Sequence, residues 1–353
     1  MLHSWSIYGK LRMIGSNISM CIDFYHQPHL DFHRRTPIIL LNIKTSETAM
    51  TNLAENIKIT PTGGPLGAEV RGIDFSAPVD NSTATALNAA WSEHLVLLFR
   101  DQDISDAEHI AASALFGEPA VGASRSYYEK SGIPPGNNVV KHPEIAVISN
   151  LGPDGVPVME NDGLGSGEVV WHSDNSYIET PPAGSFLRAL EVPPKGGSTS
   201  FTNQYLAYET LPNDVKARIT GLYTKQDSTR NSAGVLRPGV TAPKTLADVP
   251  GPDHPLVRLH SVTGRKALYL GRRRVFPSQF IIGWDRAESE DLLNFLWNHA
   301  TQAKFEWGHD DWRPGDMLLW DNRCVMHHRA PHAGTHRRIM HRTQLGREKP
   351  IAA

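Results

Sequence analysis

The chain has 353 residues, of which 40% are hydrophobic and 20% are charged, and its 35 basic and 37 acidic side chains give a formal net charge of -2. This near-neutral balance argues against a nucleic-acid or membrane-surface partner, because such binders usually carry a basic excess. Two cysteines are too few for a disulfide framework and suit a reducing cytoplasm. The bulk numbers therefore predict a cytoplasmic enzyme or small-ligand binder.

The first 49 residues differ from the rest, since they show no helical or strand period and carry scattered His, Arg and Tyr side chains. A regular pattern begins at Met50. We expect residues 1–49 to be a non-native or disordered extension and residues 50–353 to form a single domain. A signal peptide is disfavoured, because no apolar stretch of the usual length precedes a small-residue cleavage site.

The first half of this domain predicts short strands and two helices. Alternating apolar and polar residues predict strands at 57–60 and 68–73. A helix at 83–94 leads into a buried strand at 95–99, and a second helix spans 105–116, where Ser105 and Glu108 form a capping-box pattern.

The second half begins with residues 118–170, which are rich in Gly, Pro, Asn and Ser and are interrupted by a strand at 144–149. A loop of this length predicts a lid over a site. Short strands then dominate up to residue 341, with helices at about 204–220 and 285–301. The later helix has an apolar stripe of ordinary core type. The expected class is α+β with a mainly β core.

The sharpest local signal is Trp171-His172-Ser173-Asp174, which follows a strand-like run. Alternate side chains of a strand point to one face, so His172 and Asp174 can bind one cation together. Taken alone, a His-x-Asp pair is a weak signal.

A second signal lies near the C-terminus, where a buried strand and a turn precede His327 and His328. A histidine from this distant strand would complete two histidines and one carboxylate, the ligand set of non-haem Fe(II) oxygenases, with coordination positions left open. His327 and His328 are the two candidates for this third ligand.

A third signal is the pair Arg338 and Arg342, which share one face if residues 337–343 form a strand. Two inward guanidinium groups are costly unless an anion meets them, and arginine is the natural bidentate partner of a carboxylate. The alternative is a pair of solvated surface arginines.

Together these segments resemble the Fe(II)/2-oxoglutarate-dependent dioxygenases of the taurine dioxygenase and 2,4-dichlorophenoxyacetate dioxygenase family. The resemblance runs from about residue 57 to residue 350. It is carried by residues 96–102, 115–118, 171–174, 196–199, 320–323 and 337–342. It implies a double-stranded β-helix (a cupin-like jelly roll) with flanking helices.

The resemblance also implies residue roles. His172, Asp174 and His327 correspond to the catalytic iron ligands. Thr199 and Arg338 correspond to the partners of the distal carboxylate of 2-oxoglutarate. Arg342 corresponds to an arginine near the proximal carboxylate that also touches an anionic substrate in some members.

The implied reaction is an oxidation by O2 that uses Fe(II) and converts 2-oxoglutarate to succinate and CO2. We expect hydroxylation of a small anionic organic substrate, with C–O, C–S or C–N cleavage where the attacked carbon bears a heteroatom. The family commonly forms dimers or tetramers, so a homo-oligomer is expected. A cupin-like metal-dependent hydrolase or isomerase and a non-catalytic jelly-roll binding protein are the alternatives.

The sequence departs from sulfonate-binding members of the family. Where those carry His and Tyr after the Phe-Gly element, this chain has Gly122 and Arg125, and Glu168 replaces an Asn four residues before the first histidine ligand. Taurine is therefore a doubtful substrate. An iron halogenase is disfavoured too, because it would lack the carboxylate ligand that Asp174 supplies.

Substrate-binding candidates are Arg125, Glu168, Asn175, Tyr177 and Arg342. Glu168 would meet an amine or orient a metal ligand. Tyr177 lines either an apolar pocket or the core. The run at residues 272–274 is three arginines, which either favour an anionic substrate or form a solvated face.

Overall fold

The computed structural model describes residues 57–121, 140–152, 154–158, 166–230, 236–237, 239–273 and 276–353. All of them belong to one compact unit, Met50–Ala353. The predicted extension at residues 1–49 and much of the predicted lid lie outside the described residues, and both stay predictions. Within the described segments, no helix has the length and apolar character needed to cross a membrane.

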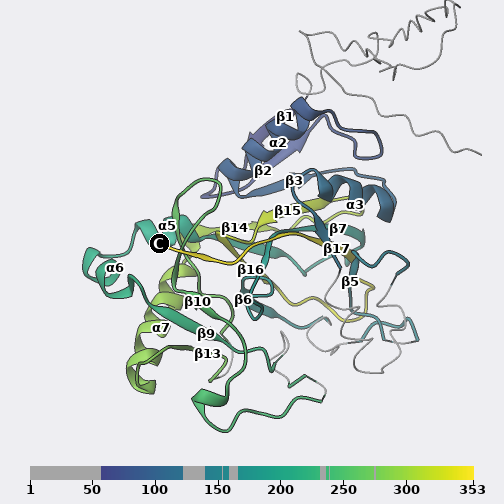
Figure 1. Ribbon diagram of the computed structural model, residues 1–353. Coiled ribbons are helices and arrows are strands. Elements are labelled where there is room, and N and C mark those ends of the chain that lie inside the picture. The colour runs from purple at the N-terminus through teal and green to yellow at the C-terminus, as the bar shows by residue number, and fades with distance from the viewer. Residues whose placement is uncertain are drawn as a thin grey trace, which may run out of the picture. The chain divides into compact units, whose positions relative to one another are not determined.

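A long sheet forms the frame of this unit (Figure 1). Its strands lie in the order β1 (Lys58–Pro61), β2 (Ala68–Arg71), β3 (Val96–Phe99), β15 (Met317–Asp321), β7 (Pro182–Glu191), β17 (Ile339–Arg347) and β4 (Pro119–Ala120), with β5 (Ala146–Ser149) also paired to β17. β15 is antiparallel to both β3 and β7. Segments from the two ends of the chain therefore lie side by side at the centre of the sheet.

A second sheet contains four antiparallel strands. Their order is β14 (Glu306–His309), β8 (Thr199–Asn203), β16 (Val325–Arg329) and β6 (Val169–His172). Phe201 and Val325 of this sheet belong to the same buried cluster as Leu187, Trp320 and Met340 of the long sheet. The mainly β, jelly-roll fold predicted from the sequence is confirmed.

The apolar sequence of the central strands follows from their burial on both faces. In β3, Leu97 and Phe99 pack in the cluster beneath the N-terminal helices, whereas Val96 and Leu98 pack in the cluster between the two sheets. Successive side chains point to opposite faces of a strand, so a strand that is covered on both sides needs a continuous apolar run.

Two three-stranded sheets complete the β structure. One contains β10 (Asp253–Pro255), β9 (Tyr223–Gln226) and β13 (Gln279–Ile281), and the other contains β12 (Lys266–Leu268), β11 (Val257–Leu259) and β18 (Ile351–Ala352). Two 3-10 turns, η2 (Leu246–Asp248) and η3 (Ala303–Phe305), lie in the connections.

The helices flank the sheets and mostly follow the predicted spans. They are α2 (Asn81–His94), α3 (Asp106–Ala114), α5 (Gln204–Glu209), α6 (Asn213–Ile219) and α7 (Arg286–Ala300). The capping box of α3 forms as predicted, because Ser105 Oγ accepts from the Glu108 amide while the Glu108 carboxylate accepts from the Ser105 amide. The apolar stripe of α7 is buried against the core.

The prediction of one helix at about 204–220 is wrong, because the chain forms α5 and α6 there instead. Pro212 stands at the N-cap of α6 and lacks the amide hydrogen that a continuous helix would require. Proline is tolerated where a helix starts, so the chain restarts at Asn213.

Truncation of Phe186 tests the packing of the core. Phe186 is fully buried, and its ring meets those of Phe75, Phe99 and Phe116 at centroid distances of 5.9, 5.6 and 5.9 Å. We expect Phe186→Ala to lower the free energy of unfolding by about 3–5 kcal/mol in urea titrations. The control Phe295→Ala removes a ring that is 44% exposed and should cost less than about 1 kcal/mol. Equal losses would contradict this description of the core.

Candidate metal centre

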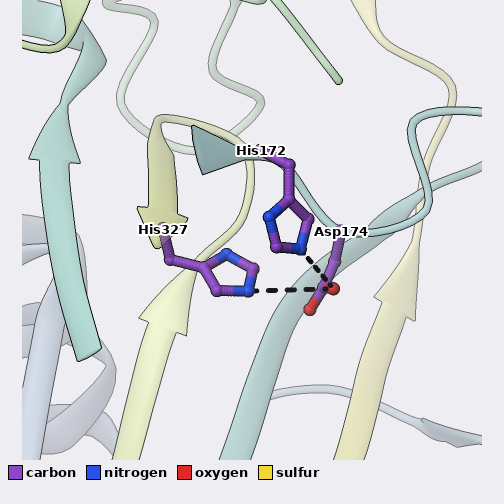
Figure 2. Close-up of side chains that lie close together, drawn as sticks. All are labelled: His172, Asp174 and His327. Atoms are coloured by element: carbon purple, nitrogen blue, oxygen red, sulfur yellow. Dashed lines mark ion pairs between the residues drawn. The ribbon is translucent and has the colours of Figure 1, made fainter. Parts of the chain in front are cut away.

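Three predicted residues, His172, Asp174 and His327, come together where β6 ends beside β16 (Figure 2). His172 is the last residue of β6, and His327 lies directly opposite it in β16. Asp174 Oδ1 lies 3.8 Å from Nε2 of His172 and 4.0 Å from Nε2 of His327. The two histidine nitrogens and the carboxylate thus converge on one point.

Hydrogen bonding and packing orient the two imidazoles. His172 Nδ1 donates to the Val170 carbonyl over 2.8 Å, which leaves Nε2 as the free lone pair. The His327 ring packs against Trp320, with 4.8 Å between ring centroids, and against Phe201. Its Nδ1 is buried and meets no hydrogen-bond partner among the described residues, so packing holds this ring.

Asp174 is 4% exposed, and its carboxylate is held by two side chains. Ser185 Oγ donates to Oδ2 over 2.7 Å, and a guanidinium nitrogen of Arg342 lies 3.0 Å from Oδ1. Burial alone would raise the pKa of Asp174, but the charge of Arg342 and the Ser185 hydrogen bond lower it below its ordinary value. The carboxylate is therefore ionised.

The protonation states suit a divalent cation. Burial lowers the pKa of His172 to about 4 and that of His327 well below its usual range. Metal ligands must be neutral imidazoles and ionised carboxylates, and all three side chains are in that state near neutral pH. Two histidines and one carboxylate on one side of a cation leave further coordination positions open, so this donor set fits Fe(II).

His328 faces away from this cluster. Its Nε2 lies 2.7 Å from Oε1 of Glu168, and its ring packs on Trp171. The geometry therefore favours His327 in the competition between the two histidines. Glu168 is exposed and is not among the described residues that line the cavity, so its contact with substrate stays a prediction.

A cavity opens beside the three residues and contains the predicted 2-oxoglutarate partners. Thr199 and Arg338 both line it. Thr199 Oγ1 is buried without a hydrogen-bond partner in the described part of the chain. Arg338 is 2% exposed, and burial together with the nearby Arg329 charge lowers its pKa to about 9. A buried hydroxyl and a guanidinium without a carboxylate partner among the described residues fit a carboxylate ligand.

Most of the remaining predicted substrate residues lie in the wall of the cavity. Arg342, Asn175 and Tyr177 line the cavity. Asn175 has a left-handed backbone (φ 50°), donates to Gln344 Oε1 over 2.8 Å and accepts from the Tyr177 hydroxyl over 3.1 Å. Arg125 lies outside the described residues.

The sequence allowed two interpretations of Arg272, a contact with an anionic substrate or a solvated face, and the structure places it in the cavity wall. It is 7% exposed, lines the cavity and forms an isolated β-bridge with His172. Its guanidinium donates to the Arg230 carbonyl and lies 5.3 Å from the centre of the Tyr177 ring. By contrast, Arg273 reaches out to Glu290 and Asn294 of α7. Of the run at residues 272–274, Arg272 thus belongs to the cavity.

A second cluster with metal-ligand chemistry contains His260, Asp321 and Cys324. Both oxygens of Asp321 already accept from Arg323, over 2.8 and 2.7 Å, and His260 Nε2 lies 2.9 Å from Oδ2. Burial raises the pKa of the Cys324 thiol above its usual range, so this sulfur is protonated. The guanidinium already occupies the place of a cation, and this cluster is structural.

Comparison with known proteins agrees with this geometry. The family described as "Taurine catabolism dioxygenase TauD, TfdA family" matches residues 58–344. The (S)-phenoxypropionate/alpha-ketoglutarate-dioxygenase of Sphingobium herbicidovorans is 33% identical over 297 residues, which cover 81% of this chain and 94% of that protein. The alpha-ketoglutarate-dependent sulfate ester dioxygenase of Pseudomonas putida is 30% identical over 310 residues, which cover 84% and 92%.

The structural comparison gives the same result. A taurine dioxygenase from Burkholderia xenovorans superposes with a TM-score of 0.65 at 32% identity, over 84% of this chain and 91% of that one. The predicted enzyme class, fold and cofactors are confirmed by these likenesses. This chain belongs to the TauD/TfdA family of Fe(II)- and 2-oxoglutarate-dependent dioxygenases.

Proposed function

We propose that this dioxygenase holds Fe(II) with Nε2 of His172, Nε2 of His327 and the carboxylate of Asp174, and binds the distal carboxylate of 2-oxoglutarate with Arg338 and Thr199. The observation that carries this proposal is the convergence of two neutral imidazoles and one ionised carboxylate beside a buried guanidinium, Arg338, that has no carboxylate partner among the described residues. A hydrolase or isomerase would need no 2-oxoglutarate. A non-catalytic binding protein would have no use for the pair of Arg338 and Thr199, whose hydroxyl meets no hydrogen-bond partner among the described residues.

We propose further that the substrate is a small organic anion. Among the described residues, four arginines line the cavity, at positions 272, 329, 338 and 342, against one carboxylate, Asp174. A local excess of positive charge in a largely buried cavity attracts anions, so an anionic substrate would be stabilised there. Arg342 and Arg272 are the candidates for this contact, with Asn175 and Tyr177 beside them. The names of the relatives point to the same class, namely a phenoxypropionate and a sulfate ester.

When bound, Fe(II) and 2-oxoglutarate supply the activation of O2 and the oxidation of a substrate C–H bond, with release of succinate and CO2. The protein positions the reactants and excludes water. Arg342 and Ser185 keep Asp174 ionised, and Trp320 holds the His327 ring. If the oxidised carbon bears oxygen, sulfur or nitrogen, the hydroxylated product breaks that bond.

Two further proposals concern location and assembly. We infer a cytoplasmic enzyme, because Cys324 is a buried free thiol and the chain has only two cysteines. A homodimer or homotetramer is carried over from the family resemblance alone.

Oxidation of organic anions tests the proposed function. With Fe(II), ascorbate and 2-oxoglutarate, we expect succinate and O2 consumption to rise when a substrate from a panel of arylalkanoic acids, sulfonates and sulfate esters is added. Amino acids and neutral analogues of the active compounds serve as controls. Faster turnover of the neutral analogues would contradict the proposal of an anionic substrate.

Substitution of Asp174 tests the metal centre. Asp174→Ala removes the carboxylate on which both imidazoles converge, so we expect no Fe(II) binding and no succinate. The matched control is His328→Ala, which removes the neighbouring imidazole that faces Glu168 and should leave Fe(II) affinity within about threefold. Full turnover by Asp174→Ala, or loss of iron in His328→Ala alone, would refute the assignment of the ligands.

Substitution of Arg338 tests the 2-oxoglutarate site. A hydrogen bond to a charged group contributes about 1.5–3 kcal/mol, so Arg338→Ala should raise the KM for 2-oxoglutarate by roughly 10- to 150-fold. The KM for the primary substrate should change far less. The control is Arg337→Ala, because the adjacent Arg337 is exposed and pairs with Glu191. Equal effects on both KM values would contradict the role of Arg338.

A further inference from the structure

Two buried asparagines hold the backbone of functional residues at the points where strands end. We infer that Asn322 is a positioning residue for Asp174 and that Asn150 is a positioning residue for Arg338. This inference rests on the proposed function, because it assigns an effect on metal to one asparagine and an effect on 2-oxoglutarate to the other.

Both functional residues lie just outside a strand. Asp174 is two residues beyond the end of β6, and Arg338 is one residue before the start of β17. Inside a strand, the neighbouring strands satisfy the backbone amide and carbonyl groups. At a strand end these groups need another partner, and a buried backbone group without one is costly.

Asn322 supplies that partner to Asp174. Its Oδ1 accepts from the Asp174 amide over 2.7 Å, and its Nδ2 donates to the Asp174 carbonyl over 3.0 Å. Nδ2 also donates to the Pro182 carbonyl over 2.9 Å. Asn322 is 1% exposed, so these bonds form away from bulk water. One side chain thus binds both polar groups of the Asp174 backbone, as a neighbouring strand would.

Asn150 binds the backbone of Arg338 in a similar way. Its Oδ1 accepts from the Arg338 amide over 2.9 Å, and its own amide lies 3.3 Å from the Arg338 carbonyl. Its Nδ2 donates to the His336 carbonyl over 2.9 Å. Asn150 is also 1% exposed. The start of β17 is therefore fixed before the guanidinium of Arg338 enters the cavity.

Each asparagine is itself anchored. The turn that carries Asn322 is held by the double bond between Arg323 and Asp321, and the Asn322 amide donates to the Ala183 carbonyl over 2.9 Å. The Asn150 carbonyl accepts from the Val158 amide over 2.7 Å. Residues that are rigidly held can fix the geometry of a ligand through its backbone.

The two anchors are independent, and this separates their expected effects. Asn322 bonds to Asp174 and Asn150 bonds to Arg338, and neither asparagine has a side-chain bond to the other's target among the described residues. Loss of the partner that orients a metal ligand typically weakens metal affinity by about 10- to 100-fold. A general loss of stability would instead weaken the binding of metal and of 2-oxoglutarate alike.

The test compares Asn322→Ala with Asn150→Ala in the full chain. Mn(II) affinity is measured without 2-oxoglutarate, and 2-oxoglutarate affinity is measured by calorimetry at saturating Mn(II), where no turnover occurs. We expect Asn322→Ala to weaken Mn(II) binding by about 10- to 100-fold and to change 2-oxoglutarate binding less than threefold. Asn150→Ala should show the reverse, with 2-oxoglutarate weakened about tenfold or more.

The control is Asn203→Ala, because Asn203 is another buried asparagine that bonds to backbone, at Pro65, Tyr205 and Leu206, away from Asp174 and Arg338. It should lower the melting temperature while leaving both binding constants within threefold. If an alanine variant fails to fold, serine replaces it, because a hydroxyl cannot bond both backbone groups that the asparagine spans.

The outcomes separate this inference from the proposed function. Parallel losses of both affinities in both variants, or no loss in either, would overturn the positioning roles. Failure of the unmodified chain to bind Mn(II) or 2-oxoglutarate would contradict the proposed function itself and remove the basis of the inference.

Discussion

The pairing of β6 with β16 is the constraint on which the site depends. It sets His172 directly opposite His327, with 4.1 Å between their ring centroids. A slip by one residue would turn every side chain of one strand to the other face and separate the two imidazoles. The register shifts between His327 and Arg329, and irregularities of this kind are common beside active sites. The jelly-roll core beneath keeps this short pairing in place.

Charge balance is the second constraint, and it links the metal centre to the substrates. Asp174 stays ionised through Arg342 and Ser185, while Arg338 is buried with a lowered pKa and a second arginine nearby. The described residues that line the cavity thus carry more positive than negative charge. Such a site favours anionic ligands, and the fold supplies the low-dielectric surroundings that strengthen each contact. The same positive charge that keeps Asp174 ionised for the metal therefore also suits the cavity to 2-oxoglutarate and an anionic substrate.

Much of this site could be predicted, because its residues stand in short sequence motifs with a regular spacing. Strand alternation pointed to the His-x-Asp pair and to Arg338 with Arg342, although Asp174 and Arg338 lie just outside β6 and β17. Arg272 was ambiguous, because its burial depends on a bridge to His172 that joins distant segments. Glu168 was a substrate candidate by its place near His172, but in the structure it is exposed and lies beside His328. The roles of buried asparagines cannot be read from sequence, since they arise from backbone groups left at strand ends.

A crystal structure of the chain, grown with Mn(II) and 2-oxoglutarate under anaerobic conditions, would show directly which residues hold the metal and the co-substrate. We expect one metal ion bound by Nε2 of His172, Nε2 of His327 and the carboxylate of Asp174, with the distal carboxylate of 2-oxoglutarate on Arg338 and Thr199. A metal ion held by His328, or by the His260, Asp321 and Cys324 cluster, would contradict it. So would 2-oxoglutarate that leaves the Arg338 guanidinium without a carboxylate.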